Sequence, residues 1–273
     1  MMRSSTRKKE HTIVLLSDMG RNNASVEITR TIIHNISPNA KVYDATHNIP
    51  IGDVHYAAFV LWSCYKYYPI GSIISTIVDP GIGTSRAILA VHADDYLFIA
   101  PDNGVLKYIF GDTKVREVHR VNNRELMNPK VCTTFLARDL YGPVSAHFAE
   151  GIQLRTAGPM MTTTETKPEK FVPIKNIEQK KAEGEIVHID HYGNLVTNLD
   201  MREYYDRGEE IRFTLKKNIK GQFYRTYGFG VEIKNKPFAY VGSHGLIEIA
   251  LANKSAAKEL KIELGEKISI ILI

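Results

Sequence analysis

Polar side chains that could bind or activate a ligand follow three apolar, strand-like runs in the first half of the chain. Asp18 comes directly after the run 12–17, and a carboxylate there could accept hydrogen bonds from a ribose diol. Asp79 and Arg86 lie in VDPGIGTSR, whose Pro and Gly residues require a tight loop that brings both side chains to one mouth. Asp102 lies in the turn APDNGVL. Because ligands of open α/β sheets bind beyond the carboxyl ends of the strands, these clusters predict a binding site.

Each of these clusters also has a purely structural interpretation. Asp18 could cap the turn that follows it, and Asp102 is expected to be the N-cap of the helix after its own turn. Asp79 and Arg86 could form an ion pair whose only role is to close their loop. The residues by themselves leave these alternatives open.

The motifs indicate neither a metal nor a bound cofactor. The ten histidines never fall in a metal-binding pattern such as HExxH, and the segments GxGxxG and the phosphate loop do not occur. An ordinary dinucleotide-binding enzyme is therefore disfavoured. Structural roles are expected for three of the histidines, His47, His119 and His147.

The elements that must position these clusters alternate between strands and helices as far as residue 155. Apolar runs predict strands over 12–18, 41–46, 72–79, 87–101 (two strands around an Asp-Asp turn) and 115–121. Helical spacing of apolar residues predicts helices over 25–36, 53–69, 105–110 and 143–151. This alternation predicts an α/β domain over 12–155, with a mostly parallel sheet covered on both faces.

The character of the sequence changes beyond residue 155. A polar, charged stretch predicts a linker over 156–182. Short strand-like runs separated by turns follow, among them QFYRTYGFGV, and only NKSAAKELK has a helical pattern. We expect a smaller, antiparallel, β-barrel-like domain over 183–273. Its polar turns DHYGN and GSHG are, taken alone, no more specific than ordinary hairpin turns.

Bulk properties are those of a soluble globular protein with a sizeable core. The 273 residues carry a net charge of +5, and 44% of them are hydrophobic. Part of the positive charge lies in residues 1–11, which we expect to be a disordered, solvated tail. No apolar run approaches the ~20 residues that span a bilayer, and the start lacks the apolar core of a signal peptide. Two distant cysteines, Cys64 and Cys132, argue against a disulfide framework, so a cytoplasmic location is expected.

Seven short segments occur in an order that resembles one family. The family comprises the S-adenosylmethionine hydroxide adenosyltransferases, which are adenosine-forming hydrolases related to fluorinating and chlorinating enzymes. The resemblance covers most of the chain, from about residue 12 to 273, and the segments are LLSDMG, ATHNIP, IVDPGIGTSR, APDNGVL, TTFLARDLYGPVSAHFAEG, IDHYGNLVTN and GSHGLIEIA. It implies an α/β domain joined to a β-barrel domain, in agreement with the pattern of elements.

The resemblance also implies roles for individual residues. Asp79 and Arg86 match the catalytic Asp and Arg of the family. Asp18 would hold the ribose hydroxyls, Ser25 would lie near the methionine end, and Tyr192 would stack on the base. The remaining ligand-binding residues would meet the adenine and methionine ends: Asp190, Asn194, Ser243 and His244.

The family resemblance implies partners as well. Its members are trimers whose site lies between the first domain of one subunit and the second domain of a neighbour. S-Adenosylmethionine would be the substrate rather than a cofactor, and adenosine a product. We expect a homotrimer that binds these small molecules and has neither a nucleic-acid nor a membrane partner.

The sequence departs from the family pattern at four positions. Hydrolases of the family carry TFHGRD, whose His is the third catalytic member, whereas Leu136 stands at that place here and cannot relay a proton. Ala137 replaces a Gly, and Asn23 replaces an acidic residue. Gly52 lies where the halogenating relatives have a Trp.

Three functions remain open from the sequence. The first is a hydrolase that attacks C5′ of S-adenosylmethionine with water and is slow without the family His. The second is a non-catalytic protein that binds S-adenosylmethionine or adenosine. The third is a halide-using adenosyltransferase, which the carboxylate of Asp79 disfavours because it would repel a desolvated halide.

Overall fold

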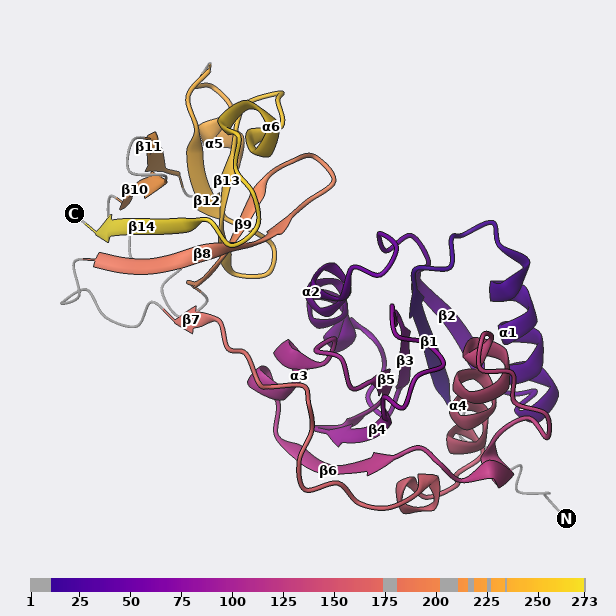
Figure 1. The fold of residues 1–273 in the computed structure, drawn as a ribbon. Helices are drawn as coiled ribbons and strands as arrows, with labels where there is room; N and C mark the ends of the chain where they lie inside the picture. The colour runs from indigo at the N-terminus through magenta and orange to yellow at the C-terminus, as the bar shows by residue number, and fades with distance from the viewer. Residues whose placement is uncertain are drawn as a thin grey trace, which may run out of the picture. The chain divides into compact units, whose positions relative to one another are not determined.

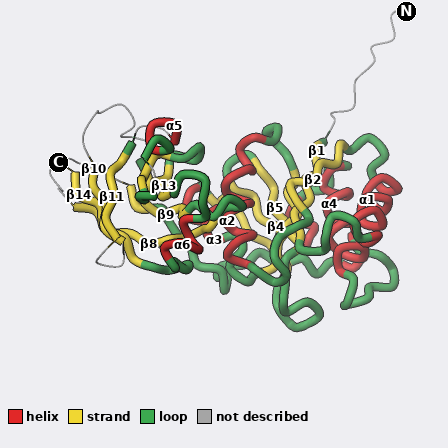
Figure 2. The backbone as a smooth tube through the Cα atoms, turned by 90° about the horizontal axis from the view of Figure 1, so that it is seen from above, coloured by secondary structure: helices red, strands yellow, loops and turns green. Residues whose placement is uncertain are grey.

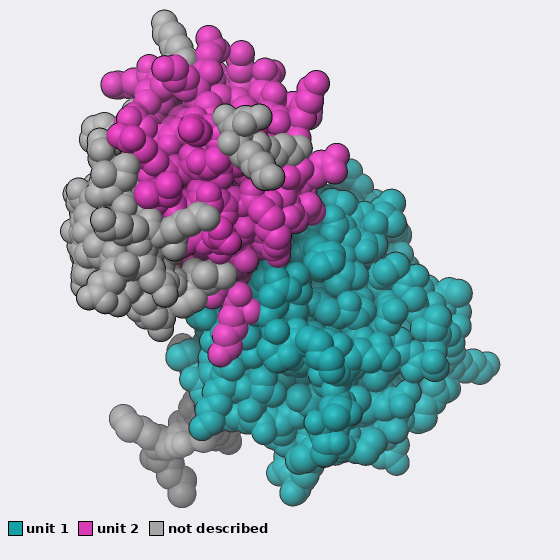
Figure 3. All heavy atoms as spheres, turned by 60° about the vertical axis from the view of Figure 1, so that its left-hand side comes forward, with its two compact units in different colours: residues 1–169 teal, residues 170–273 magenta. Residues whose placement is uncertain are grey.

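The computed structural model describes residues 11–173, 181–201, 211–215, 219–224, 227–233 and 235–272. The chain forms two compact units, coloured separately in Figure 3. The first ends at Glu169 and the second begins at Lys170, within the stretch 156–182 expected as a linker. The expected tail, residues 1–11, lies outside the described residues except for His11.

A six-stranded sheet forms the centre of the first unit. Its strands are β1 (Thr12–Ser17), β2 (Lys41–Thr46), β3 (Ile73–Ile77), β4 (Ile88–Ala93), β5 (Tyr96–Pro101) and β6 (Val115–Arg120). The strand order is β2-β1-β3-β5-β4-β6. The first four of these are parallel neighbours, whereas β4 pairs antiparallel with both β5 and β6. The predicted mostly parallel sheet is therefore confirmed, and its antiparallel part comes from the tight β4–β5 hairpin.

Helices cover both faces of this sheet, with α2 on one side and α1 and α4 on the other (Figures 1 and 2). The helices are α1 (Ala24–Ile36), α2 (Val54–Cys64), α3 (Lys107–Asp112) and α4 (Gly142–Ala149). A π-helical turn, Ala137–Tyr141, precedes α4, and short 3-10 turns span Tyr65–Tyr67, Arg124–Leu126 and Leu154–Ala157. Alternate residues of β1 and β3 pack with α1 and α4 in one apolar core, as period-two side chains require.

The second unit is a closed barrel with one added strand (Figure 1). Its strands are β7 (Val172–Pro173), β8 (Lys181–Ile189), β9 (Leu195–Asp200), β10 (Ile211–Leu215), β11 (Ile219–Phe223), β12 (Phe238–Val241), β13 (Leu246–Ala250) and β14 (Lys267–Leu272). The order is β13-β12-β11-β10-β14-β8-β9-β7, and an antiparallel pairing of β13 with β9 closes the ring. The predicted barrel is confirmed, although β11 pairs with β12 in parallel.

Two helices accompany the barrel, α5 (Tyr227–Gly230) and α6 (Ala256–Leu260). The second was predicted. Helix α5 was not predicted, because the segment QFYRTYGFGV was expected to be strand-like throughout. That expectation is wrong for the end of the segment, which forms α5. A Cβ at Gly230 would collide with the ring of Phe238, and Tyr227 packs 5.5 Å from the same ring. The segment turns so that it can cover this aromatic residue. Among the helices of the described residues, none is long and apolar enough to cross a membrane.

Candidate functional site

Asp18 lies where β1 ends, and its carboxylate is already oriented. Its Oδ2 atom accepts a hydrogen bond of 2.8 Å from the backbone N–H of Gly52. Gly52 has a φ of +70°, a conformation that favours glycine, and a Cβ there would lie 3.4 Å from Cβ of Pro80. The loop after β2 therefore connects Asp18 to the loop after β3, which carries Asp79.

Asp79 and Arg86 meet as the sequence predicted. Nη1 of Arg86 donates to Oδ1 of Asp79, which also accepts the backbone N–H of Gly81 at 2.9 Å. A Cβ at Gly81 would lie 2.5 Å from Nη1, so only glycine lets the guanidinium pass over the loop at this distance. The Asp79 side chain is 5% exposed and that of Arg86 is 28% exposed. The Asp79 carboxylate is therefore nearly buried, and the partly exposed guanidinium of Arg86 lies beside it.

The third predicted cluster supports this loop, but not in the way expected. Nδ2 of Asn103 donates to the backbone oxygen of Val78, at 2.9 Å, next to Asp79. Asp102 is not a helix N-cap, so that prediction is wrong. Its two carboxylate oxygens accept the backbone N–H groups of Glu165 and Thr166, each at 2.7 Å. These donors are more than sixty residues away in the sequence, which is why local spacing could not reveal them.

A buried polar chain that was not predicted stands beneath Asp18. Ser17 Oγ lies 2.7 Å from Nδ1 of His47, and Nε2 of that ring lies 3.1 Å from Oδ1 of Asp44. Arg30 donates to the other oxygen of Asp44 at 2.6 Å. Ser17 and His47 are both buried. This chain ties the end of β1 to the end of β2, in line with the structural role expected for His47.

Ser25 and Asn23 lie at the start of α1, the next element along the chain. Asn23 is the N-cap, and its Oδ1 accepts the backbone N–H of Ser25 at 2.9 Å. Its Nδ2 donates to the backbone oxygen of Met19, four residues earlier in the chain, at 3.1 Å. Asn23 thus has a capping role.

The segment that carries Leu136 is held by its neighbours. Asp139, only 1% exposed, accepts two hydrogen bonds from Arg138, one from Nδ2 of Asn128 and one from the backbone N–H of Cys132. The Arg138 guanidinium also lies 4.8 Å from the centre of the Phe135 ring. Leu136 itself is half-buried and packs against the core of the first unit. Hydrogen bonds to Asp139, rather than the Leu136 side chain, therefore set the path of the backbone.

Replacing Asp139 by Asn should lower the free energy of unfolding by about 1–3 kcal/mol, because donors that face the carboxylate lose an acceptor. The hydrogen bonds from Arg138 outweigh burial and hold the pKa of Asp139 well below its usual range. The stabilisation is therefore complete above the unfolded-state pKa of about 4 and is lost as pH falls below it. Urea unfolding at about pH 7 and about pH 3 checks this: the difference from wild type should shrink at the lower pH.

The matched control is Asp95→Asn, which removes an exposed ion pair with Arg116 at 3.2 Å. That change should cost less than about 1 kcal/mol. An Asp139 variant no less stable than the control would contradict the structural role of this carboxylate.

In the second unit, Asp190 and Asn194 build the turn between β8 and β9. Oδ1 of Asp190 accepts the backbone N–H groups of Tyr192 and Asn194 at 2.9 and 2.8 Å, and Oδ2 accepts Nδ2 of Asn194 at 2.9 Å. A Cβ at Gly193 would collide with the side chain of Ser255, the N-cap of α6. The turn is therefore rigid, and the ring of Tyr192, 78% exposed, is presented to solvent.

Ser243 and His244 lie in the turn between β12 and β13, where the structure adds a carboxylate that the sequence analysis missed. Glu248 is 8% exposed, and its Oε2 accepts the hydroxyl of Tyr240 at 2.5 Å. Burial raises its pKa; the hydrogen bond from Tyr240 acts in the opposite direction, and the charge of Asp190 raises it further. A carboxylate in the otherwise apolar run LIEIA was the available signal. Burial disfavours the charged form of His244 as well, and for a histidine this lowers the pKa.

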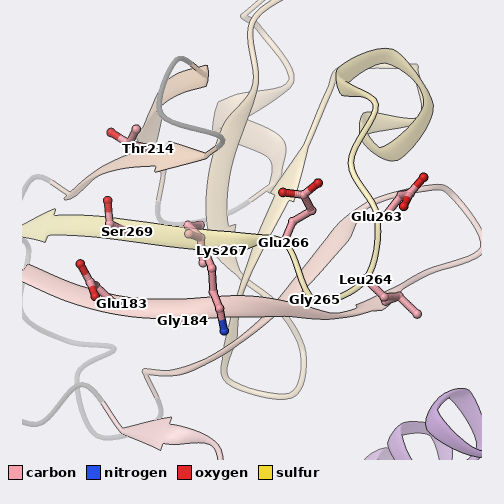
Figure 4. Close-up of a pocket in the computed structure, with 10 residues that line it drawn as sticks. Glu183, Gly184, Thr214, Glu263, Leu264, Gly265, Glu266, Lys267 and Ser269 are labelled. Carbon is pink, nitrogen blue, oxygen red and sulfur yellow. The ribbon is translucent and has the colours of Figure 1, made fainter.

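The predicted residues thus form one group in each unit. Asp18, Asp79 and Arg86 lie on adjoining loops of the first, with Ser25 at the start of α1; the second holds the turns of Asp190, Tyr192 and Asn194 and of Ser243 and His244. A separate hollow on the barrel is lined by Glu183, Glu263, Glu266 and Lys267 and contains none of them (Figure 4). Within the described residues, no group of three His, Cys, Asp or Glu side chains could hold a metal ion.

Comparisons with known proteins cover nearly the whole chain. A family model described as the SAM hydroxide adenosyltransferase N-terminal domain matches residues 13–158, and the corresponding C-terminal domain model matches residues 184–269. A protein of Salinispora tropica named (R)-S-adenosyl-L-methionine hydrolase is 29% identical, over 94% of this chain and 97% of its own length. A Thermus thermophilus protein of the same name is 26% identical, over 95% of this chain and 99% of its own.

A more distant relative and a solved structure also match nearly the whole chain. A fluorinase of an Actinoplanes species is 22% identical, over 94% of this chain and 96% of its own length. The crystal structure of an uncharacterized conserved protein from Thermotoga maritima superimposes with a TM-score of 0.82 at 28% identity, covering 95% of this chain and 99% of that one.

Proposed function

Because the chain belongs to the S-adenosylmethionine hydroxide adenosyltransferase family, we propose that it hydrolyses S-adenosylmethionine to adenosine and methionine. The observation that carries the proposal is the Asp79–Arg86 pair, whose carboxylate is nearly buried after the carboxyl end of β3, beside the loop that orients Asp18. Relatives that match almost end to end are named for this hydrolysis of the (R) form. We therefore propose the (R)-sulfonium epimer as the substrate.

The chemistry requires a positioned water more than an acid. An oxygen–carbon bond forms between water and C5′ while the carbon–sulfur bond breaks, and its electron pair leaves on sulfur as neutral methionine. One water proton stays on the new hydroxyl of adenosine and the other must be accepted nearby. Bulk water is a poor nucleophile, with a pKa near 15.7, so its orientation and the proton acceptor are what the protein has to supply.

Asp79 supplies the acceptor. Its Oδ1 is already engaged by Arg86 and Gly81, and within the part of the chain that the structure describes Oδ2 has no hydrogen-bond partner. Oδ2 can therefore accept a proton from a water in line with the carbon–sulfur bond. Arg86 keeps the carboxylate oriented, and positioning of this kind supplies about 7–11 kcal/mol in ideal cases.

The experiment is release of adenosine from the two separated sulfonium epimers, followed by chromatography and read beside isothermal titration with the same ligands. Adenosine that accumulates in proportion to enzyme, faster from the (R) form, supports the hydrolase. Binding without product at high enzyme concentration would instead support the second candidate, a non-catalytic binder, which the absence of a His at Leu136 favours. The halide-using alternative is opposed by the buried Asp79 carboxylate.

Asp18→Ala should weaken S-adenosylmethionine and adenosine binding by about 1–3 kcal/mol, because ribose hydroxyls would lose an acceptor inside the complex. The dissociation constant from isothermal titration measures this. Asp53→Ala, which removes the N-cap of α2 on the other side of Gly52, controls for general damage to the loop. Affinity unchanged by Asp18→Ala but reduced by the control would remove Asp18 from the binding site.

We further propose roles and an assembly that rest on the family resemblance. Ser25 would lie near the methionine end; Tyr192 would stack on adenine; and four polar residues would bind the adenine and methionine ends, namely Asp190, Asn194, Ser243 and His244. A homotrimer that takes only small-molecule partners is proposed, and its mass by light scattering at micromolar concentration tests it. The free thiols of Cys64 and Cys132 support a cytoplasmic location.

A further inference from the structure

Tyr141 is a buried tyrosine whose hydroxyl the fold leaves unsatisfied. It ends the π-helical turn Ala137–Tyr141 and is 1% exposed. Among the described residues, no group hydrogen-bonds its phenolic oxygen. Buried tyrosine hydroxyls ordinarily have a partner, and leaving one without costs free energy. A phenylalanine would fill the same apolar space, so the hydroxyl calls for an explanation.

The position of Tyr141 relative to the sheet follows from a chain of short contacts. Ser145, one turn further along α4, lies with its Oγ 2.7 Å from Oγ of Ser75 in β3 and donates to the backbone oxygen of Tyr141 at 2.6 Å. Ser75 and Ile77 alternate in β3 and so face the same side of the sheet, and Asp79 follows two residues after the end of the strand. Tyr141 packs in the same core cluster as Ile77, the last residue of β3, which stands two residues before Asp79.

The electrostatics agree with this placement. Burial raises the pKa of Tyr141 well above its ordinary value, the Asp79 carboxylate raises it further, and the Arg86 guanidinium lowers it. Both members of the ion pair thus act on this one hydroxyl. A phenol with a raised pKa stays protonated at neutral pH, so it can only act as a hydrogen-bond donor or a neutral acceptor.

We propose that the Tyr141 hydroxyl is a catalytic group that binds the attacking water together with Asp79. The water donates one proton to Oδ2 of Asp79 and accepts the O–H of Tyr141, which leaves a lone pair for C5′. As the oxygen–carbon bond forms and the carbon–sulfur bond breaks, that proton passes to Asp79 and the phenol keeps its own. The phenol stabilises the hydroxide character that develops on the water.

This inference rests on the proposed hydrolase function and adds a residue to it. Leu136 offers neither a proton nor an acceptor, and it lies in the same held segment, five residues before Tyr141. Tyr141 therefore offers the water a polar group from this segment, which Leu136 cannot do.

The test is Tyr141→Phe, which removes one oxygen atom. We expect kcat for adenosine release to fall roughly 10- to 100-fold, the effect of losing a hydrogen bond to a charged group, with KM for S-adenosylmethionine within about twofold. Because the fold does not use this hydroxyl, the melting temperature should not decrease. The matched control is Tyr65→Phe: its hydroxyl is also buried, but it packs with Tyr96 and Phe98 on the α2 side of the sheet. Its turnover should equal that of wild type.

Each outcome decides the question. Equal turnover of wild type and Tyr141→Phe overturns the role of Tyr141 while leaving the hydrolase standing. A fall in kcat that is shared by Tyr65→Phe, or accompanied by a lower melting temperature and a higher KM, assigns the hydroxyl to packing and also overturns it. A wild type that binds S-adenosylmethionine but releases no adenosine overturns the hydrolase itself, and with it any catalytic group.

Discussion

Asp79→Asn should reduce kcat for adenosine release by about 10²- to 10⁴-fold, the range expected for loss of a proton-accepting group. Asn keeps the size of the side chain and can still accept the backbone N–H of Gly81, which Oδ1 of Asp79 accepts at 2.9 Å. It cannot take a proton from water at neutral pH, and it removes the negative charge that faces Arg86. Single-turnover measurement of adenosine, with saturating S-adenosylmethionine, isolates the chemical step.

Asp95→Asn is the appropriate comparison, since it also removes an Asp–Arg pair of the first unit, but an exposed one. It should leave turnover unchanged. The titrated affinity of Asp79→Asn for S-adenosylmethionine should stay within about tenfold of wild type, because the sulfonium is attacked at this point rather than anchored there. A folded Asp79→Asn enzyme with more than about half the wild-type rate would show that this carboxylate accepts no proton.

Leu136→His should raise turnover by at least about tenfold, and by up to the 10²- to 10⁴-fold that a general base typically contributes. The segment is held by the hydrogen bonds of Asp139 and by the packing of Arg138 on Phe135, so a new side chain at position 136 should leave the backbone in place. An imidazole with a pKa near 6.5 is largely neutral above that pH and can accept the water proton. The gain should therefore appear as pH rises through about 6.5 and be lost below it.

Leu136→Gln separates proton transfer from polarity, because it places a polar side chain there that does not titrate. It should not be faster than wild type. Leu136 packs against the core, so an unpaired imidazole would cost about 1–3 kcal/mol of stability, which thermal melting would reveal. A folded Leu136→His protein that gains no activity at any pH, or a glutamine variant that gains as much, would show that this position does not control the chemistry.

Much of the architecture was determined by the sequence alone, because burial imposes its pattern on consecutive residues. The runs at β1 and β3 are mostly apolar and buried throughout, since these strands are covered on both faces, and the structure places them within two residues of the predicted bounds. The Pro and Gly residues of VDPGIGTSR forced a tight turn, and the turn brought Asp79 to Arg86 as expected. Local chemistry was sufficient wherever the interacting groups were close in sequence.

The tertiary structure decided everything that depends on partners far apart in the chain. Asp102 is a residue type that often caps helices, yet its carboxylate accepts the backbone N–H groups of residues 165 and 166. Glu248 acquires its burial from a strand order that no periodicity specifies. The same holds for Tyr141: its sequence context is that of an apolar core residue, and only the packing of α4 on β3 leaves its hydroxyl unbonded near the charges of Asp79 and Arg86. Hydrogen bonds and charges join groups that can be far apart in the sequence, so only the folded structure shows which groups pair. Burial of a strand or helix, by contrast, sets the pattern of apolar residues within that element, so the sequence shows it directly.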